Sequence, residues 1–61
     1  MILTLKQAAL FLSLHPNTLY HLAQQRRIPS AKIGGQWRFN QMTLETWLDG
    51  QMHRREAVGK R

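Results

Sequence analysis

The fold of this chain is decided by the stretch Lys32-Ile33-Gly34-Gly35-Gln36-Trp37-Arg38-Phe39. Two glycines stand between two short runs of strand-forming residues, which is the pattern of a β-hairpin. The stretch follows one helical pattern and precedes another. The sequence therefore predicts a small hairpin wing, over about residues 30–39, set between helices.

The register of this hairpin has two alternatives. A two-residue turn at Gly34-Gly35 pairs Ile33 with Gln36 and scatters the apolar residues over both faces. A three-residue loop over residues 34–36 pairs Ile33 with Trp37 and gathers the apolar side chains on one face, which leaves Lys32 and Arg38 on the other. Because this register buries the apolar set, we predict the three-residue loop.

Apolar spacing ahead of the hairpin predicts two helices. A face with helical periodicity covers residues 5–12, and Thr4 with Gln7 forms a capping box at its start. A second helix is expected over residues 16–25, with proline at its first position and His15 as its cap. The connection between them is too short for antiparallel packing, so the helices should cross steeply, as in a helix-turn-helix.

A third helix is expected over about residues 41–49, capped by Asn40 and ended by Gly50. Residues 51–61 are basic and poor in apolar side chains, which predicts a flexible tail. The expected fold is therefore mainly α with a small β-hairpin, a winged helix-turn-helix over residues 1–50 followed by the tail.

Composition limits the classes of function. The 61 residues carry nine Lys and Arg against three Asp and Glu, a formal charge of +6, and no cysteine. So small a chain argues against a deep enzyme cleft, and the charge favours a polyanionic partner. No apolar run is long enough for a membrane helix and no signal peptide is visible, so we expect a cytoplasmic protein.

The chain resembles a known family. The residues that carry the resemblance, between Leu3 and Leu48, are Leu3-Thr4, Gln7-Ala8-Ala9, Leu12, Leu14, Pro16-Asn17-Thr18-Leu19-Tyr20, Ile28-Pro29, Gly34-Gly35, Trp37-Arg38, Leu44 and Trp47-Leu48. Their order and spacing are similar to those of excisionase-type, AlpA-like winged helix-turn-helix domains, which are related to the DNA-binding heads of the MerR superfamily. Two positions depart from the family pattern: Ser13 stands where glycine is common, and His15 where serine or threonine is common.

The resemblance implies that the second helix enters the major groove of DNA and that the wing follows the neighbouring backbone or minor groove. It also implies a small transcription regulator, or a directionality factor that bends DNA and recruits an integrase. Double-stranded DNA in the nucleoid is then the expected partner. Self-association on DNA and contact with a recombinase or the transcription machinery are further expectations.

The chemistry of such an interface divides the candidate residues into two sets. Amide and other uncharged polar side chains read base edges, whereas Lys and Arg neutralise phosphates. The base-reading candidates are Asn17, Tyr20, His21, Gln24 and Gln25. The backbone candidates are Pro16 and Thr18, at the positive end of the second helix, and Arg26, Arg27, Lys32 and Arg38.

Other readings have weaker support. The three histidines show no metal-ligand spacing, and the sequence indicates no cofactor. Glu45 and Asp49 share a helix face, but without a third catalytic group they do not suggest an enzyme. The alternative function is a protein-interaction module that docks on a recombinase or self-assembles, with Leu10, Phe11 and Trp37 as apolar contacts. Trp37 fits the hydrophobic core better than an exposed role.

Overall fold

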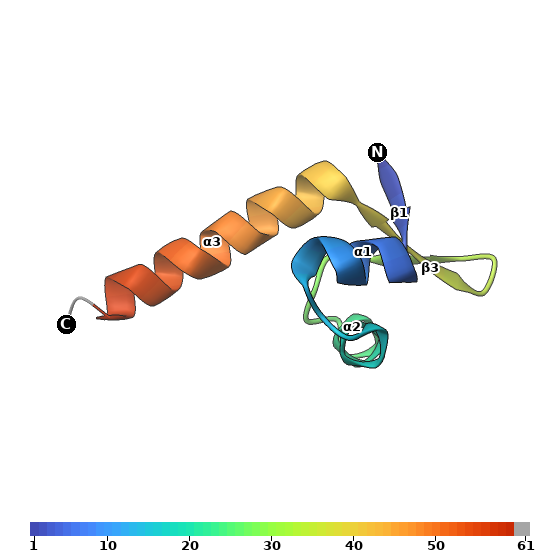
Figure 1. Ribbon diagram of the computed structural model, residues 1–61, viewed down its shortest axis with the longest axis horizontal. Coiled ribbons are helices and arrows are strands. Elements are labelled where there is room, and N and C mark those ends of the chain that lie inside the picture. The colour runs from blue at the N-terminus through green and yellow to red at the C-terminus, as the bar shows by residue number, and fades with distance from the viewer. Residues whose placement is uncertain (60–61) are drawn as a thin grey trace.

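The computed structural model describes the backbone of residues 1–59 and the side chains of residues 1–53. Its elements are β1 (Ile2–Thr4), α1 (Leu5–Leu12), α2 (Pro16–Gln24), β2 (Ala31–Ile33), β3 (Gln36–Asn40) and α3 (Gln41–Gly59). Helices α1 and α2 cross steeply, the β2–β3 hairpin projects to one side and α3 runs out on the other (Figure 1). This is the winged helix-turn-helix arrangement that the sequence predicts.

Helix α1 begins where its capping box predicts. The Gln7 N–H donates to the Thr4 hydroxyl at 3.2 Å, and the Gln7 side chain accepts from the Thr4 N–H at 2.9 Å. Two donors that the first turn leaves without helical partners are therefore satisfied within the chain.

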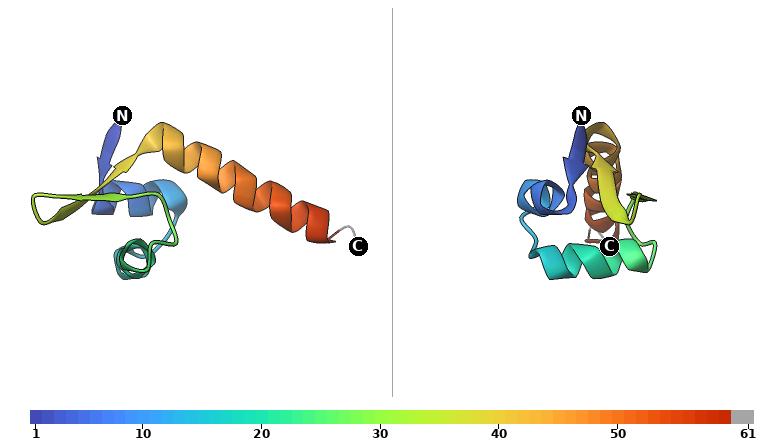
Figure 2. Two further views of the ribbon diagram at one scale, coloured as in Figure 1. Left: turned by 180° about the vertical axis from the view of Figure 1, so that it is seen from behind. Right: turned by 90° about the vertical axis from the view of Figure 1, so that its right-hand side faces the viewer.

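The turn between α1 and α2 depends on a left-handed residue. Ser13 has φ 58° and ψ 41°, and the Leu14 N–H donates to the Ala9 carbonyl at 2.8 Å. The Ser13 N–H donates to the Leu10 carbonyl at 3.1 Å, which completes a Schellman-type end. Glycine is the residue that best tolerates this conformation, so Ser13 carries backbone strain at the corner of the helix pair. Figure 2 shows the resulting perpendicular layout of the two helices from the side.

Helix α2 is capped by a histidine. The Nδ1 atom of His15 accepts from the Asn17 N–H at 3.1 Å, and Pro16 occupies the first turn, where its missing N–H costs nothing. This confirms His15 as the cap and requires its ring proton to lie on Nε2. The helix ends one residue earlier than predicted, at Gln24, because Arg26 turns left-handed with φ 57° before Pro29 is reached.

The hairpin belongs to a three-stranded antiparallel sheet in the order β1-β3-β2. Strand β1 was not predicted, because three residues ahead of a helix carry too little periodicity to indicate a strand. It pairs with β3 through Leu3 opposite Phe39, and the Gln41 N–H donates to the Met1 carbonyl at 2.9 Å. The start of the chain therefore holds the base of the hairpin.

The predicted three-residue loop is wrong. Ile33 pairs with Gln36 and Lys32 with Trp37, so the turn contains only Gly34 and Gly35. Their φ angles are 59° and 80°, and two positive φ values in succession give the turn twist that matches the twist of paired strands. This local preference outweighs the burial of Ile33, whose side chain stays 64% exposed.

The register also changes which side chains share a face of the sheet. Trp37 and Phe39 lie on the face of the sheet that points toward the core, as predicted. Lys32 lies on the same face as Trp37, not on the face of Arg38. Residues directly opposite each other on antiparallel strands lie on the same face. Lys32 and Arg38 therefore lie on opposite faces, which corrects the expectation that they share one.

Helix α3 continues past its predicted end. Thr43 N–H donates to Asn40 Oδ1 at 3.1 Å, which confirms the cap, but the helix runs through Gly50 to Gly59. One glycine inside a helix costs only about 1 kcal/mol relative to alanine, and here it does not adopt the left-handed conformation that would end the helix. Among the described residues, no helix is both long enough and apolar enough to cross a membrane.

The hydrophobic core lies where α1, α2, the sheet and the first turns of α3 meet. Its buried members are Leu3, Ala8, Ala9, Leu19, Ala23, Ile28, Phe39 and Leu44. Trp37 and Trp47 are half-buried against it, as predicted for both. The core is small, and it fixes the position of α2 relative to the hairpin.

Candidate nucleic-acid interface

The outward face of α2 is uncharged and polar. Leu19 and Ala23 bury the opposite face completely, with 0% and 1% exposure. All the base-reading candidates have exposed side chains: Asn17, Tyr20, His21, Gln24 and Gln25. The structure thus brings them together on one solvent-facing surface, with rigid packing behind it.

The N-terminal end of α2 lies at the border of this face. Pro16 is half-buried, whereas Thr18 is exposed and adjoins Asn17. The first turn of a helix carries partial positive charge and N–H groups that favour a phosphate oxygen. His15 occupies the Asn17 N–H, so it competes with an anion for one of these donors.

The other end of α2 carries two cations. Arg26 and Arg27 are exposed, and the Arg27 N–H donates to the Leu22 carbonyl at 2.9 Å. Arg26 takes the left-handed position in a second Schellman-type end, where glycine is again favoured. Backbone strain is therefore kept at a basic residue that borders the polar face.

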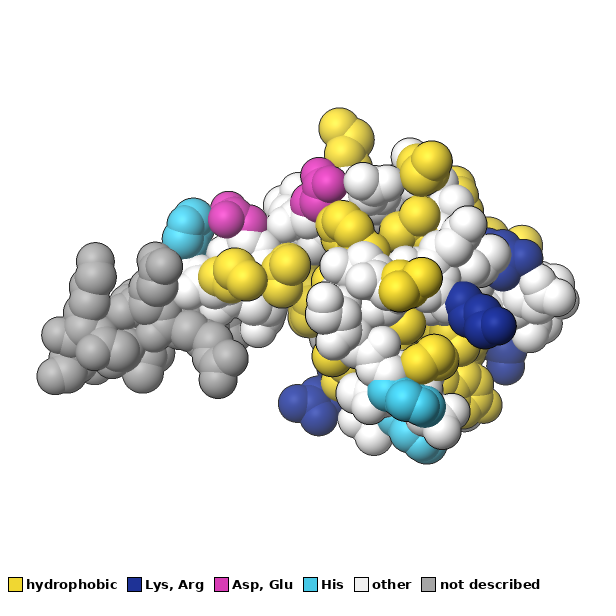
Figure 3. Space-filling model, in the orientation of Figure 1, with side chains coloured by type: hydrophobic (Ala, Val, Ile, Leu, Met, Phe, Trp, Pro, Cys, Tyr) yellow, Lys and Arg dark blue, Asp and Glu magenta, His cyan; other side chains and the backbone are white. Residues whose placement is uncertain are grey.

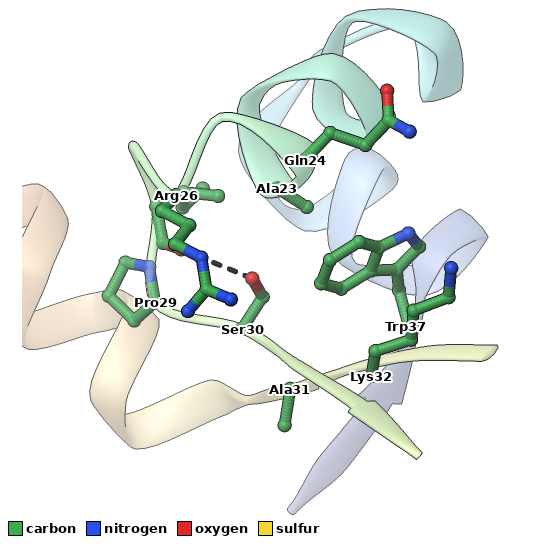
Figure 4. Close-up of a pocket in the computed structure, with 9 residues that line it drawn as sticks. Ala23, Gln24, Arg26, Pro29, Ser30, Ala31, Lys32 and Trp37 are labelled. Carbon is green, nitrogen blue, oxygen red and sulfur yellow. Dashed lines mark hydrogen bonds between the residues drawn. The ribbon is translucent and has the colours of Figure 1, made fainter. Parts of the chain in front are cut away.

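A groove separates α2 from the hairpin. Gln24 and Arg26 line one wall, and Lys32 and Trp37 line the other (Figure 4). The Lys32 ammonium lies 5.6 Å from the centre of the Trp37 ring, a cation–π distance. Lys32 therefore lies over the Trp37 ring, on the hairpin wall of the groove.

Arg38 lies on the opposite face of the sheet, yet its side chain reaches a second groove. That groove, which we call the Tyr20 groove, is lined by Thr4, Leu5, Lys6, Tyr20, Gln36, Trp37 and Arg38. The guanidinium of Arg38 donates to the Trp37 carbonyl at 2.9 Å and to the Gln36 side chain. Arg38 is thus half-buried and held by the hairpin itself.

Lys6 is a cation that sequence reasoning missed. It is exposed on α1 and lines the Tyr20 groove together with Arg38. The helical pattern of α1 places Lys6 away from the core, but only the packing of α1 against the hairpin brings it to this site. No local signal in the sequence indicates that neighbourhood.

Charge is divided unevenly along the chain. Residues 1–40 contain no Asp or Glu, and their cations are Lys6, Arg26, Arg27, Lys32 and Arg38. The acidic residues are Glu45, Asp49 and Glu56, all within the span of α3. Figure 3 shows most of the visible Lys and Arg side chains on the side of the hairpin, another below the body of the domain, and acidic side chains on α3. The polar face of α2 therefore lies in a positive field that favours a polyanion.

Within the residues whose side chains are described, no three His, Asp or Glu side chains come together to hold a metal ion. The Nε1 atom of Trp37 is buried without a hydrogen-bond partner, while its ring packs against the core. Trp37 thus joins the hairpin to the body of the domain.

Comparison with known proteins gives one result. A family model described as a helix-turn-helix domain matches residues 2–52. No curated protein and no solved structure matches. The matched residues include α1, α2, the sheet and the first part of α3.

Proposed function

Because this chain belongs to the helix-turn-helix family, in its excisionase or AlpA-like group, we propose that this DNA-binding protein recognises a specific sequence in double-stranded DNA. The observation that carries the proposal is the exposed, uncharged polar face of α2, set in the acid-free region of residues 1–40. Amide side chains discriminate between base edges, and the surrounding cations supply affinity that does not depend on sequence.

In this proposal, α2 enters the major groove with its polar face toward the bases. The N-terminal turn of α2 meets one phosphate, at Pro16 and Thr18, and Arg26 and Arg27 meet the backbone at the other end. The hairpin follows the adjacent backbone or minor groove, with Lys32 and Arg38 as phosphate contacts. Lys6 joins them, because it shares the Tyr20 groove with Arg38.

The size of the domain favours several copies on one DNA site. Single modules of this kind bury only about 600 to 1,000 Å² of protein surface on DNA, which limits the selectivity of one copy. We propose that neighbouring copies occupy repeated half-sites. The biological role is then control of excision or of transcription in the nucleoid, with a recombinase or the transcription machinery as protein partner.

Selection from a pool of random duplexes tests the proposal. The protein should enrich a recurrent motif, and a titration should show at least about a hundredfold affinity gap between that motif and a scrambled duplex at ~0.15 M salt. Equal affinity for both duplexes would contradict the proposal. Band patterns at increasing protein concentration report the number of copies on the motif.

A second candidate function is a protein-interaction module, favoured by exposed apolar side chains on α1. Leu10 is 81% exposed and Phe11 is 39% exposed, whereas Trp37 is half-buried and no longer fits this role. Sedimentation of the protein without DNA separates the two functions. Self-association there, together with no DNA binding at low salt, would favour the interaction module.

A further inference from the structure

One pair of side chains on the polar face of α2 is already joined. The Nε2 group of Gln24 donates a hydrogen bond to the Tyr20 hydroxyl oxygen, at 3.1 Å, one helical turn earlier. Both side chains are exposed, so neither is forced into this geometry by burial of its polar end. The amide of Gln24 is thus oriented before any ligand arrives.

Tyr20 is a hydrogen-bond partner whose own position is restricted. The residue is 36% exposed and borders the Tyr20 groove together with Leu5 and Trp37. It also meets the His21 ring edge-on, with the ring centres 5.7 Å apart. The ring contact with His21, together with the two rotatable side-chain torsions of tyrosine, restricts where the hydroxyl lies.

The hydrogen bond leaves a defined recognition edge on Gln24. An amide nitrogen has two N–H groups, and Tyr20 engages one of them. The second N–H and the Oε1 acceptor remain, and together they match the N7 acceptor and the N6 amino donor of adenine in the major groove. Figure 4 shows the Gln24 amide pointing out from α2, away from Ala23 and Trp37.

We propose that Gln24 reads an adenine and that Tyr20 is the positioning residue that holds its amide for this contact. The inference rests on the proposed recognition of double-stranded DNA. It gives the Tyr20 hydroxyl a role through Gln24 rather than on a base. Ordering a free glutamine side chain on binding costs conformational entropy, and the Tyr20 hydroxyl removes part of that cost in advance.

Gln25 is the natural control, because it has the same side chain in a different place. It follows the last helical residue as the C-cap of α2, with φ −83° and ψ 1°. At about 100° of rotation per residue, Gln25 lies farther round the helix from Tyr20 than Gln24 does. We therefore expect that the Gln25 amide does not reach the Tyr20 hydroxyl.

The experiment begins with the motif that the unmodified protein selects from random duplexes. Variants Gln24→Ala, Tyr20→Phe and Gln25→Ala are then titrated against that motif and against all single base-pair changes in it. Gln24→Ala should reduce the preference for adenine at one position by about tenfold. Tyr20→Phe keeps the ring and should reduce the same preference by about threefold, with other positions and the salt dependence unchanged.

The double variant and a base analogue sharpen the test. The double variant Tyr20→Phe, Gln24→Ala should be no less selective at that position than Gln24→Ala alone. Both substitutions act on the same contact, the one between Gln24 and adenine, so their effects should not add. A duplex with 7-deazaadenine at the position lacks the N7 acceptor and should bind the unmodified protein more weakly. The Gln24→Ala variant should bind the 7-deazaadenine duplex and the ordinary duplex with equal affinity. Gln25→Ala should keep the adenine preference at the position that Gln24 reads, and any change of preference that it causes should fall at another position.

Three outcomes overturn the inference, and they are distinguishable. If the unmodified protein selects a motif but Tyr20→Phe keeps the full adenine preference, Tyr20 does not position Gln24. If Gln24→Ala relaxes no position, Gln24 does not read a base. If the unmodified protein selects nothing, the proposed function fails first and the inference fails with it.

Discussion

The polar face of α2 and the hairpin are neighbours with opposite chemical character. The face of α2 offers amides, an imidazole and a phenol, and residues 16–25 contain no Lys, Arg, Asp or Glu. The hairpin offers Lys32 and Arg38 on its two faces. Amides discriminate bases, whereas cations neutralise phosphates of any sequence. In the proposed function, selectivity and affinity therefore depend on separate elements, and we expect that each can be changed alone.

The two regions also differ in how they are held. Helix α2 is positioned by a fully buried apolar face, whereas the hairpin is tied to the body through its base and through Trp37 and Phe39. The turn of the hairpin is open, because nothing lies within 4 Å of a Cβ at either Gly34 or Gly35. We therefore expect α2 to be the more rigid of the two surfaces.

The largest effect should come from breaking the packing that holds the two regions side by side. Phe39→Ala removes a buried ring that is 2% exposed, and we expect a loss of about 3 to 5 kcal/mol in the free energy of unfolding. Urea denaturation followed by circular dichroism measures this loss. Ile33→Ala, on the exposed side of the same hairpin, is the control and should stay within about 0.5 kcal/mol of the unmodified protein. Similar losses for both variants would show that the hairpin does not take part in the core as described.

The second effect separates affinity from selectivity. Arg38→Ala should weaken binding to all duplexes alike, by about eightfold at ~0.1 M salt, because one fewer phosphate is neutralised. The slope of log affinity against log salt should become shallower by about 0.9. Titrations at several salt concentrations measure both quantities. Gln25→Ala should leave the slope unchanged, and a change of preferred sequence in Arg38→Ala would assign base reading to the hairpin.

A smaller effect should come from the start of α2. His15→Ala removes the acceptor for the Asn17 N–H, which should lower the free energy of unfolding by about 1 kcal/mol. His15→Asn keeps an acceptor at the cap and should recover most of this loss. Thermal unfolding of the three proteins checks the order. Equal melting temperatures for His15→Ala and the unmodified protein would show that the cap contributes nothing.

The smallest effect should be a gain. Ser13→Gly relieves the left-handed conformation at the turn between α1 and α2, and we expect about 0.5 to 1 kcal/mol of added stability. Urea denaturation again measures it. Ser13→Ala is the control: alanine keeps the Cβ that is strained at this φ, so its stability should stay close to that of the unmodified protein. If Ser13→Gly is no more stable than the unmodified protein, the strain assigned to this turn is absent.

Local sequence patterns predict the helices and their caps well. The capping box at Thr4, the histidine cap of α2 and the Asn40 cap of α3 all depend on residues close together in the chain, and the structure confirms each one. The exposed face of α2 follows from the same helical spacing. These features depend on short-range geometry, which the sequence expresses directly.

The errors fall where distant residues or backbone conformation decide the outcome. The hairpin register was predicted from burial alone, but positive φ at Gly34 and Gly35 determines the turn. Strand β1 exists because β3 pairs with it, and Lys6 reaches the site because α1 packs near Arg38. The end of α3 was predicted from a single glycine, whose cost is too small to stop a helix.

The central place of β3 in the sheet has a practical meaning for handling this protein. Because the first residues pair along one edge of β3, anything attached or removed at the amino terminus acts directly on the hairpin. A purification handle fused there could disturb the pairing of β1 with β3, the strand that carries Arg38. The described residues of α3 take no part in the sheet, so variants intended for quantitative comparison are better tagged at the carboxyl end.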